Sequence, residues 1–181
     1  MINTIIDIDL SILSFIAANL KCAFLDFFMP IITKLGDHGI IPIILAVVLI
    51  IIPKTRKTGI AMGIAIALGG LFGNLILKNV IARTRPYDIV EGIELLVPAL
   101  SDFSFPSGHT LVVFEVATVL LKREKRAIGI VAMVLAVIVA FSRLYLYVHY
   151  PTDVIVGVIL GIAFGLVGCF AVNKIEKSFK K

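Results

Sequence analysis

Long apolar runs separated by short polar segments dominate the chain. Three of them, residues 59–81, 127–148 and 153–172, reach the roughly 20 residues that a helix needs to cross the hydrocarbon core of a bilayer. All three are rich in glycine and alanine, which let membrane helices approach one another closely. The pattern predicts three closely packed membrane-spanning helices.

Two shorter runs predict two further spans. Residues 39–52 can be extended upstream by Leu35 and Gly36, whereas the run 107–121 has only 15 residues, which gives about 22 Å of helix. A helix this short can span only if its outer end lies below the lipid surface, either buried in protein or lining a water-filled cavity. We therefore expect five spans, one of them incomplete at its outer end.

The first 35 residues are less regular. Asp7, Asp9, Lys21 and Asp26 interrupt their apolar character, and Pro30 would kink a single helix through them. A cleaved signal peptide is not expected, because the start has no basic residue and no small-residue cleavage site follows an apolar core. We expect an amphipathic helix or a partial span, and hence an all-α integral membrane bundle of about six helices.

Composition excludes a soluble protein. The 181 residues are 60% apolar and 16% charged, with a mean hydropathy of +1.09, whereas soluble domains have roughly 45–50% apolar and about 25% charged residues. The same apolar content excludes a disordered chain. We expect residues 1–181 to form a single membrane-embedded domain.

Basic residues are unevenly distributed along this apolar chain. Lys and Arg number 17 against 12 Asp and Glu, for a net charge of +5, and eleven of the 17 lie in three clusters that each follow an apolar run. The clusters are Lys54, Arg56 and Lys57; Lys122, Arg123, Lys125 and Arg126; and Lys174, Lys177, Lys180 and Lys181. Because basic loops mark the cytoplasmic side, we expect these clusters and the C-terminus in the cytoplasm, with residues 83–106 and 149–151 outside. This placement favours topology over nucleic-acid binding, and no nucleic-acid partner is expected.

Four cations fall on the predicted outer side, where the charge rule disfavours them: Lys78, Arg83, Arg85 and Arg143. A cation within or at the end of a membrane helix is costly unless it has an anionic or polar partner. The outer loop has too few obvious carboxylates to pair all four. The cations therefore predict a site for an anionic ligand.

Two of the three histidines are expected on the same side. His109 follows a Pro-Ser-Gly turn that opens a helix, and free backbone N–H groups at such a helix start form a ready anion site. Asp153 follows His149 by four residues, so a helix beginning near His149 would place the carboxylate against the imidazole. Such a carboxylate fixes the tautomer and activates the other ring nitrogen as a nucleophile.

These groups fit phosphoryl transfer. One imidazole would attack phosphorus in line, the other would protonate the leaving oxygen, and the cations would stabilise the charge on the remaining oxygens. The histidines are too far apart in sequence to suggest a metal cluster, so we expect the cations to replace a metal ion and no cofactor to be needed.

Three segments at fixed positions form a signature. They are K-x6-RP at Lys78 and Arg85-Pro86, PSGH at Pro106–His109, and SR-x5-H-x3-D from Ser142 to Asp153. This signature, which spans residues 78–153, resembles that of the type 2 phosphatidic acid phosphatase family, and it matches at every motif position. The resemblance implies a helical membrane enzyme that removes phosphate from lipid phosphates or pyrophosphates without a metal and is inhibited by vanadate.

The resemblance also implies roles for individual residues. His149 would be the nucleophile that forms a phosphohistidine, Asp153 its orienting partner and His109 the general acid. The phosphate-binding residues would be Lys78, Arg85, Ser107, Gly108 and Arg143. Soluble vanadium haloperoxidases share the motif, but the composition of this chain argues against that branch.

On this basis we expect a multi-pass enzyme of the cytoplasmic membrane whose site faces outward and whose partners are the bilayer and a lipid phosphate. The favoured substrate is undecaprenyl pyrophosphate, with phosphatidylglycerophosphate or phosphatidate as alternatives. A non-hydrolytic lipid or anion transporter is the alternative of another class. Three residues stay open: Arg83 as interfacial anchor or headgroup contact, Glu115 as interhelical hydrogen-bond partner or electrostatic modulator, and His38 in a polar turn or at the entrance.

Overall fold

Helices form almost all of the regular structure in residues 2–178, the range that the computed structural model describes, and no strand occurs in that range. The elements are α1 (Ile2–Asn19), α2 (Ala23–Ile32), the 3₁₀ segment η1 (Thr33–Gly39), α3 (Ile40–Ile51), α4 (Arg56–Leu68), the π-helical segment η2 (Gly69–Leu77), α5 (Lys78–Ile81), the 3₁₀ turn η3 (Pro86–Asp88), α6 (Gly108–Arg123), α7 (Arg126–Tyr145) and α8 (Pro151–Ser178). The predicted all-α class is confirmed.

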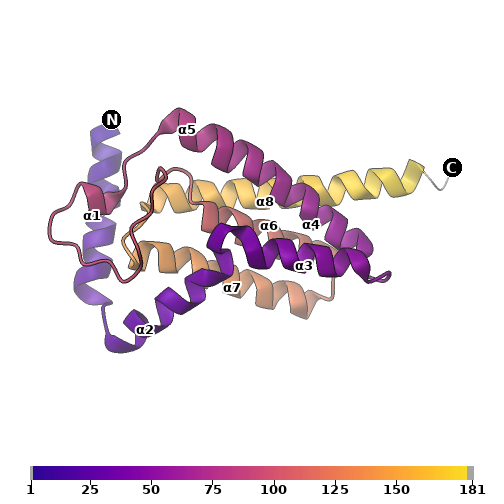
Figure 1. Cartoon of the computed structure of the whole chain (residues 1–181), viewed down its shortest axis with the longest axis horizontal. Coiled ribbons are helices and arrows are strands. Elements are labelled where there is room, and N and C mark those ends of the chain that lie inside the picture. The colour runs from indigo at the N-terminus through magenta and orange to yellow at the C-terminus, as the bar shows by residue number, and fades with distance from the viewer. Residues whose placement is uncertain (1, 179–181) are drawn as a thin grey trace.

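Within residues 2–178, four helical segments are long and apolar enough to cross a membrane: Ala23–Ile51, Arg56–Asp88, Arg126–Tyr145 and Pro151–Ser178. Of the five expected spans, the run 107–121 is not among them. The four segments extend along the long axis of the molecule (Figure 1). The first segment is broken at Asp37 and His38, whose backbone leaves the helical conformation, and not at Pro30, which lies inside α2. The fold is that of a multi-pass membrane protein.

The short helix α6 lies at the centre of this bundle. Ten of its 16 residues are buried, and its most extensive contacts are with α7 and α8. Val113 and Ala117 of α6 pack with Ala136 and Val139 of α7 and Val154 of α8 in one core cluster. Of the two alternatives predicted for the outer end of this short run, burial in protein agrees with the structure, because Ser107 and Thr110 are fully buried.

Three glycines of α8 form a seam against α6. Gly157, Gly161 and Gly165 recur every four residues, and a Cβ atom at Gly161 would lie only 2.6 Å from the carbonyl oxygen of Leu111 in α6. Small residues at this spacing let two membrane helices pack backbone to backbone. The seam therefore brings the N-terminal ends of α6 and α8 side by side.

Helix α1 is oriented differently from the spans. In Figure 1 it runs across the end of the bundle, whereas α8 extends along the long axis, and α1 contacts α7 and α8. Asp9, Leu13 and Ile16 are buried against the bundle, while an apolar stripe of Ile5, Ile8, Ile12 and Phe15 is exposed on another side of the helix. This arrangement favours the predicted amphipathic helix over a partial span.

The three basic clusters lie at the end of the bundle opposite α1. The α3–α4 turn, the α6–α7 turn and the C-terminal part of α8 meet there (Figure 1). Glu176 of α8 links the three clusters, because its carboxylate oxygen Oε1 forms ion pairs with Lys57 Nζ at 3.2 Å and with Arg123 Nη2 at 3.1 Å. Lys180 and Lys181 lie outside the described residues. The predicted common location of the other cluster members is confirmed, and the side of the membrane on which they lie stays a prediction.

Candidate active site

A cavity of about 960 Å³ opens at the end of the bundle nearest α1, between η1, η2, α6 and the loop that precedes α6. Six residues of the predicted site line it: Lys78, Arg85, Gly108, His109, Arg143 and His149. The other two, Ser107 and Asp153, are fully buried behind this lining. Residues from four separate parts of the sequence therefore meet at one cavity.

Lys78 and Arg85 face the cavity with a carboxylate between them. The carboxylate of Asp102 binds both: its Oδ2 is 2.5 Å from Lys78 Nζ, and its Oδ1 accepts a hydrogen bond of 2.6 Å from Arg85 Nη2. Partial burial opposes ionisation of Asp102, but the hydrogen bonds and charges of Lys78 and Arg85 outweigh it and lower the pKa of Asp102 to about 2. One anion can thus reach both cations, and a phosphate carries more negative charge than a carboxylate and has more acceptor oxygens.

Arg143, near the end of α7, is a buried cation in a different position. Its Nη1 donates to Thr33 Oγ1, while its Nε has no hydrogen-bond partner and no carboxylate lies within ion-pair distance among residues 2–178. A buried unpaired guanidinium is costly, and binding of an anion would offset that cost. The prediction that the outer loop has too few carboxylates to pair all four cations therefore agrees with the structure. Asp102 of that loop pairs with Lys78 and Arg85, whereas the partners of Arg83 come from α1 and α8.

His149 lies in the turn between α7 and α8 and is 1% exposed. Its Nε2 is 3.3 Å from Arg85 Nη1, while its Nδ1 is 3.5 Å from both Asp153 Oδ2 and Ser104 Oγ. The two ring nitrogens therefore have different neighbours: Nε2 faces the cationic side, and Nδ1 faces the carboxylate. The contact that the four-residue spacing predicts between His149 and Asp153 is present, at the long end of hydrogen-bond distance.

The environment of His149 keeps its ring neutral. Burial lowers its pKa to about 3, Asp153 opposes this shift through its hydrogen bond, and the charges of Arg85 and Arg143 lower the pKa further. A neutral imidazole has a free lone pair on the nitrogen that carries no proton. His149 is therefore held in the protonation state that a nucleophile requires.

His109 occupies the first turn of α6, as the Pro-Ser-Gly motif predicts. Ser107 precedes the helix, and Gly108 is needed because a Cβ atom there would lie 2.7 Å from Asn74 Oδ1. His109 Nε2 is 2.7 Å from Asp37 Oδ1, and Gly36 packs against the ring. Asp37 and His38 both line the cavity, so the second alternative for His38, a place at the entrance, agrees with the structure.

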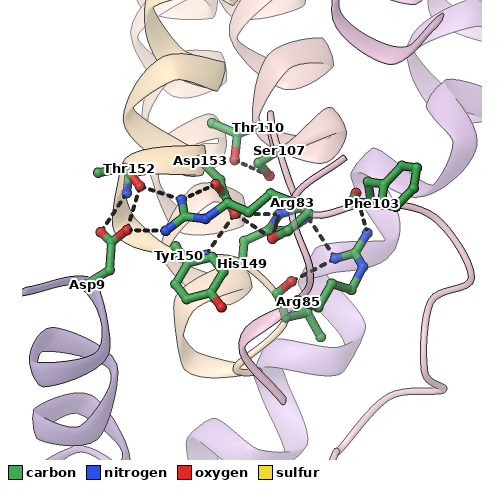
Figure 2. A network of polar contacts seen from close by, with 12 residues as sticks. Asp9, Arg83, Arg85, Phe103, Ser107, Thr110, His149, Tyr150, Thr152 and Asp153 are labelled. Carbon is green, nitrogen blue, oxygen red and sulfur yellow. Dashed lines mark hydrogen bonds and ion pairs between the residues drawn. The ribbon is translucent and has the colours of Figure 1, made fainter. Parts of the chain in front are cut away.

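Arg83 lies away from the cavity lining and is neither an interfacial anchor nor free to contact a headgroup. Its guanidinium donates to Asp153 Oδ1 and to Asp9 Oδ2, each at 2.7 Å, and it stacks on the Tyr150 ring with 3.7 Å between Cζ and the ring centroid (Figure 2). Both alternatives that the sequence left open are therefore wrong. The physical reason is the buried carboxylate of Asp9, which comes from α1 and gives Arg83 an internal partner.

Glu115 is buried at the inner end of the cavity, 1% exposed. Its Oε1 has no hydrogen-bond partner among the described residues, and it lies so close to η2 that a Cβ atom at Gly69 would overlap it. The interhelical hydrogen bond considered for Glu115 is absent at this oxygen.

Sequence reasoning missed the partners of the motif residues. Asp9, Asp37, Asp102 and Ser104 come from α1, from η1 and from the loop before α6. They share no spacing with the motifs, so only their acidic or hydroxyl side chains in an apolar chain could have drawn attention to them. Among residues 2–178, no group of three or more His, Cys, Asp or Glu side chains could hold a metal ion.

The fold and the site together define a multi-pass membrane protein with a cavity at one end of its bundle that is lined by cations and histidines. Comparison with known proteins gives this class a family. The family model described as the PAP2 superfamily matches residues 58–176. The chain belongs to the PAP2 superfamily, and it is a phosphatase that hydrolyses phosphate esters.

Relatives and solved structures agree with this assignment. The chain is 37% identical over 142 residues to the undecaprenyl-diphosphatase of Sulfolobus acidocaldarius, covering 78% of this chain and 68% of the relative. The crystal structure of LpxE from Aquifex aeolicus matches with a TM-score of 0.76 at 30% identity over 88% of this chain and 93% of that one. A PAP2-type phosphatidylglycerolphosphate phosphatase from Bacillus subtilis matches with a TM-score of 0.73 at 30% identity, covering 97% of this chain and 88% of that one.

Proposed function

We propose that this protein hydrolyses a lipid pyrophosphate at the outer face of the cytoplasmic membrane through a phosphohistidine on His149, and that the substrate is undecaprenyl pyrophosphate. The observation that carries the mechanism is the two-sided environment of His149, with Arg85 beside Nε2 and Asp153 beside Nδ1. The similarity to an undecaprenyl-diphosphatase supports the substrate.

In the first step, the terminal phosphoryl group lies among Lys78, Arg85 and Arg143. The lone pair of His149 Nε2 attacks phosphorus, the N–P bond forms, and the P–O bond to the remaining lipid phosphate breaks. His109 gives its proton to that leaving oxygen. The ring of His149 then carries a proton on Nδ1 and phosphorus on Nε2, and the carboxylate of Asp153 stabilises the resulting positive charge.

In the second step, His109 acts as a base. It takes a proton from a water molecule whose oxygen attacks phosphorus, the N–P bond breaks, and inorganic phosphate leaves. The cations stay in place through both steps, because each transition state spreads negative charge over the same phosphoryl oxygens. Ser107 and Gly108 would contribute backbone N–H groups at the start of α6.

The test is phosphate release by purified protein in detergent, with a metal chelator present and without added metal. We expect release by the native protein, none above background by His149→Ala, and a severe loss with His109→Ala. A phosphoenzyme trapped by rapid denaturation in alkali should appear with the native protein and not with His149→Ala. A non-hydrolytic transporter would release no phosphate, and unimpaired release by His149→Ala would overturn the mechanism.

The substrate is tested separately, by comparing kcat/KM for undecaprenyl pyrophosphate, phosphatidylglycerophosphate and phosphatidate in one detergent. We expect the first to be hydrolysed fastest. Phosphatidylglycerophosphate is the second candidate, because the structural match over 97% of this chain is to a phosphatase for that lipid. Equal rates on all three, or a preference for either glycerophospholipid, would contradict the substrate assignment and leave the phosphohistidine step unaffected.

A further inference from the structure

Arg83 and Asp9 form an ion pair behind the site, outside the three motifs, in which the Asp9 side chain is buried and the Arg83 side chain is 17% exposed. Neither lines the cavity, so neither can contact a bound phosphate. Both are nevertheless linked to the reacting histidine, because Arg83 binds the carboxylate of Asp153 that faces His149 Nδ1, and Asp9 binds Arg83 (Figure 2).

The two oxygens of Asp153 have different partners. Oδ1 accepts the hydrogen bond from Arg83 Nη1, while Oδ2 accepts from Ser104 Oγ at 2.5 Å and from the backbone N–H of Tyr150 at 3.0 Å and faces His149. Arg83 therefore fixes the rotation of the carboxylate about its Cβ–Cγ bond. A rotated carboxylate would lose the contact that orients the imidazole.

Asp9 holds Arg83 in turn. Its Oδ2 accepts from Arg83 Nη2 at 2.7 Å and from Thr152 Oγ1 at 2.6 Å, and its Oδ1 accepts the backbone N–H of Thr152 at 3.1 Å. Thr152 lies in the first turn of α8, directly before Asp153, so Asp9 binds the element that carries the catalytic carboxylate as well as the cation that orients it. Asp9 is only 1% exposed, and its position is fixed by these three hydrogen bonds.

Charge gives Asp9 a second effect. Arg83 alone would neutralise Asp153 and weaken its attraction for the positively charged ring that forms when His149 is phosphorylated. With Asp9 present, the three groups carry one net negative charge in a buried setting, where electrostatic interactions are stronger than in water. The arrangement keeps Asp153 both oriented and effectively anionic.

We propose that Asp9 and Arg83 are positioning residues for the catalytic carboxylate of Asp153, and that helix α1 contributes to the active site through Asp9. This inference rests on the proposed role of His149 and Asp153. It gives the N-terminal helix a function in the reaction in addition to any function at the membrane.

Asp9→Asn is the first test, with Asp7→Asn as the matched control on the same helix, because Asp7 is exposed and its carboxylate makes no contact with the site. Removing a group that orients another catalytic group typically costs about 10- to 100-fold. We expect kcat to fall about tenfold with Asp9→Asn and about 100-fold with Arg83→Gln, and Arg83→Lys to recover part of that loss. KM and the inhibition constant of vanadate should stay within about threefold, because the cavity lining is unchanged.

A double-mutant cycle separates positioning from folding. Rates are normalised to the vanadate-binding fraction of each preparation, so that misfolded protein does not count. In an Asp153→Asn background, Asp9→Asn should cause no further loss of kcat, because the carboxylate through which it acts is already gone. Full kcat in Asp9→Asn, or an equal loss in both backgrounds, would overturn the inference. If His149→Ala retained activity, the proposed mechanism would fail instead, so the two failures are distinguishable.

Discussion

His149 combines deep burial with neighbouring cations, and this determines how protonation affects the protein. Its pKa is lowered to about 3 by burial, with Asp153 opposing and Arg85 and Arg143 adding to the shift. In the unfolded chain the same ring has a pKa of about 6.5. As pH falls below about 6.5, the unfolded state therefore takes up a proton that the folded state does not.

This difference predicts that the free energy of unfolding decreases as the pH is lowered. Between about pH 6.5 and pH 3, the neutral His149 should reduce the free energy of unfolding by up to about 1.4 kcal/mol per pH unit. The measurement is the melting temperature in detergent from pH 7.5 to 4.5, for the native protein and for His149→Gln, which cannot take up the proton. We expect a steeper decline for the native protein, and equal slopes would contradict the lowered pKa. Asp102, whose pKa is lowered to about 2, loses its stabilising contribution as the pH falls from about 4 to 2, below the pH values used in this measurement.

Asp102 occupies both Lys78 and Arg85, so in the proposed mechanism a bound phosphate would displace it. The Asp102 side chain is 52% exposed, so its ion pairs are screened by water and worth about 1 kcal/mol. We expect Asp102→Asn to lower the inhibition constant of inorganic phosphate about fivefold, because the anion no longer displaces a carboxylate. Asp88→Asn, an exposed carboxylate of the same outer region, is the control. A higher inhibition constant in Asp102→Asn would mean that Asp102 assists phosphate binding.

The motif residues could be predicted at this scale and their partners could not. Lys78, His109 and His149 stand at spacings that a helix start or a helical turn makes meaningful. Asp37 and Asp102 reach the site through segments whose path depends on how the helices pack, and no local rule gives that path. Arg83 is an example, because its partner Asp9 comes from α1 and no local spacing links the two residues.

At the scale of elements, the α6–α8 seam assembles the site. It places His109 at the start of α6 next to the turn that carries His149 and the first turn of α8 that carries Asp153. The spans and the short α6 could be predicted from apolar run length, and the glycines indicated close packing. The orientation of α1 could not be predicted, because its apolar residues face both the bundle and the outside, and periodicity alone does not say which neighbour covers which side.

Gly161→Ala tests the seam. The added Cβ atom would lie 2.6 Å from Leu111 O and 2.7 Å from Phe114 Cβ, so α6 and α8 must separate. Overpacking of this kind costs about 1–3 kcal/mol, and we expect a lower melting temperature together with lower kcat. Gly63→Ala in α4 is the matched control, because no heavy atom outside its own helix lies within 4 Å of the added Cβ. A loss of stability in Gly63→Ala equal to that in Gly161→Ala would contradict a specific role for the seam.

The whole molecule is electrically asymmetric along its long axis. At the cavity end, Lys78, Arg83 and Arg85 have carboxylate partners within the protein. At the opposite end, the three basic clusters have few carboxylate partners and face outward from the bundle. Only the exposed basic clusters determine the orientation of the protein in the membrane, because exposed basic residues next to spans resist transfer across the bilayer. The orientation rule therefore applies to the α3–α4 turn, the α6–α7 turn and the end of α8.

This asymmetry predicts that the cavity opens on the outer side, and a native thiol can test it. Cys22 is exposed between α1 and α2 at the cavity end, while Cys169 is buried. In spheroplasts expressing the protein, a membrane-impermeant maleimide should label the native chain and should not label Cys22→Ser. In a Cys22→Ser background, Lys125→Cys, at the exposed α6–α7 turn, should be labelled only after the membrane is permeabilised. The reverse pattern would place the cavity in the cytoplasm, where the enzyme could act only on lipid phosphates of the inner leaflet.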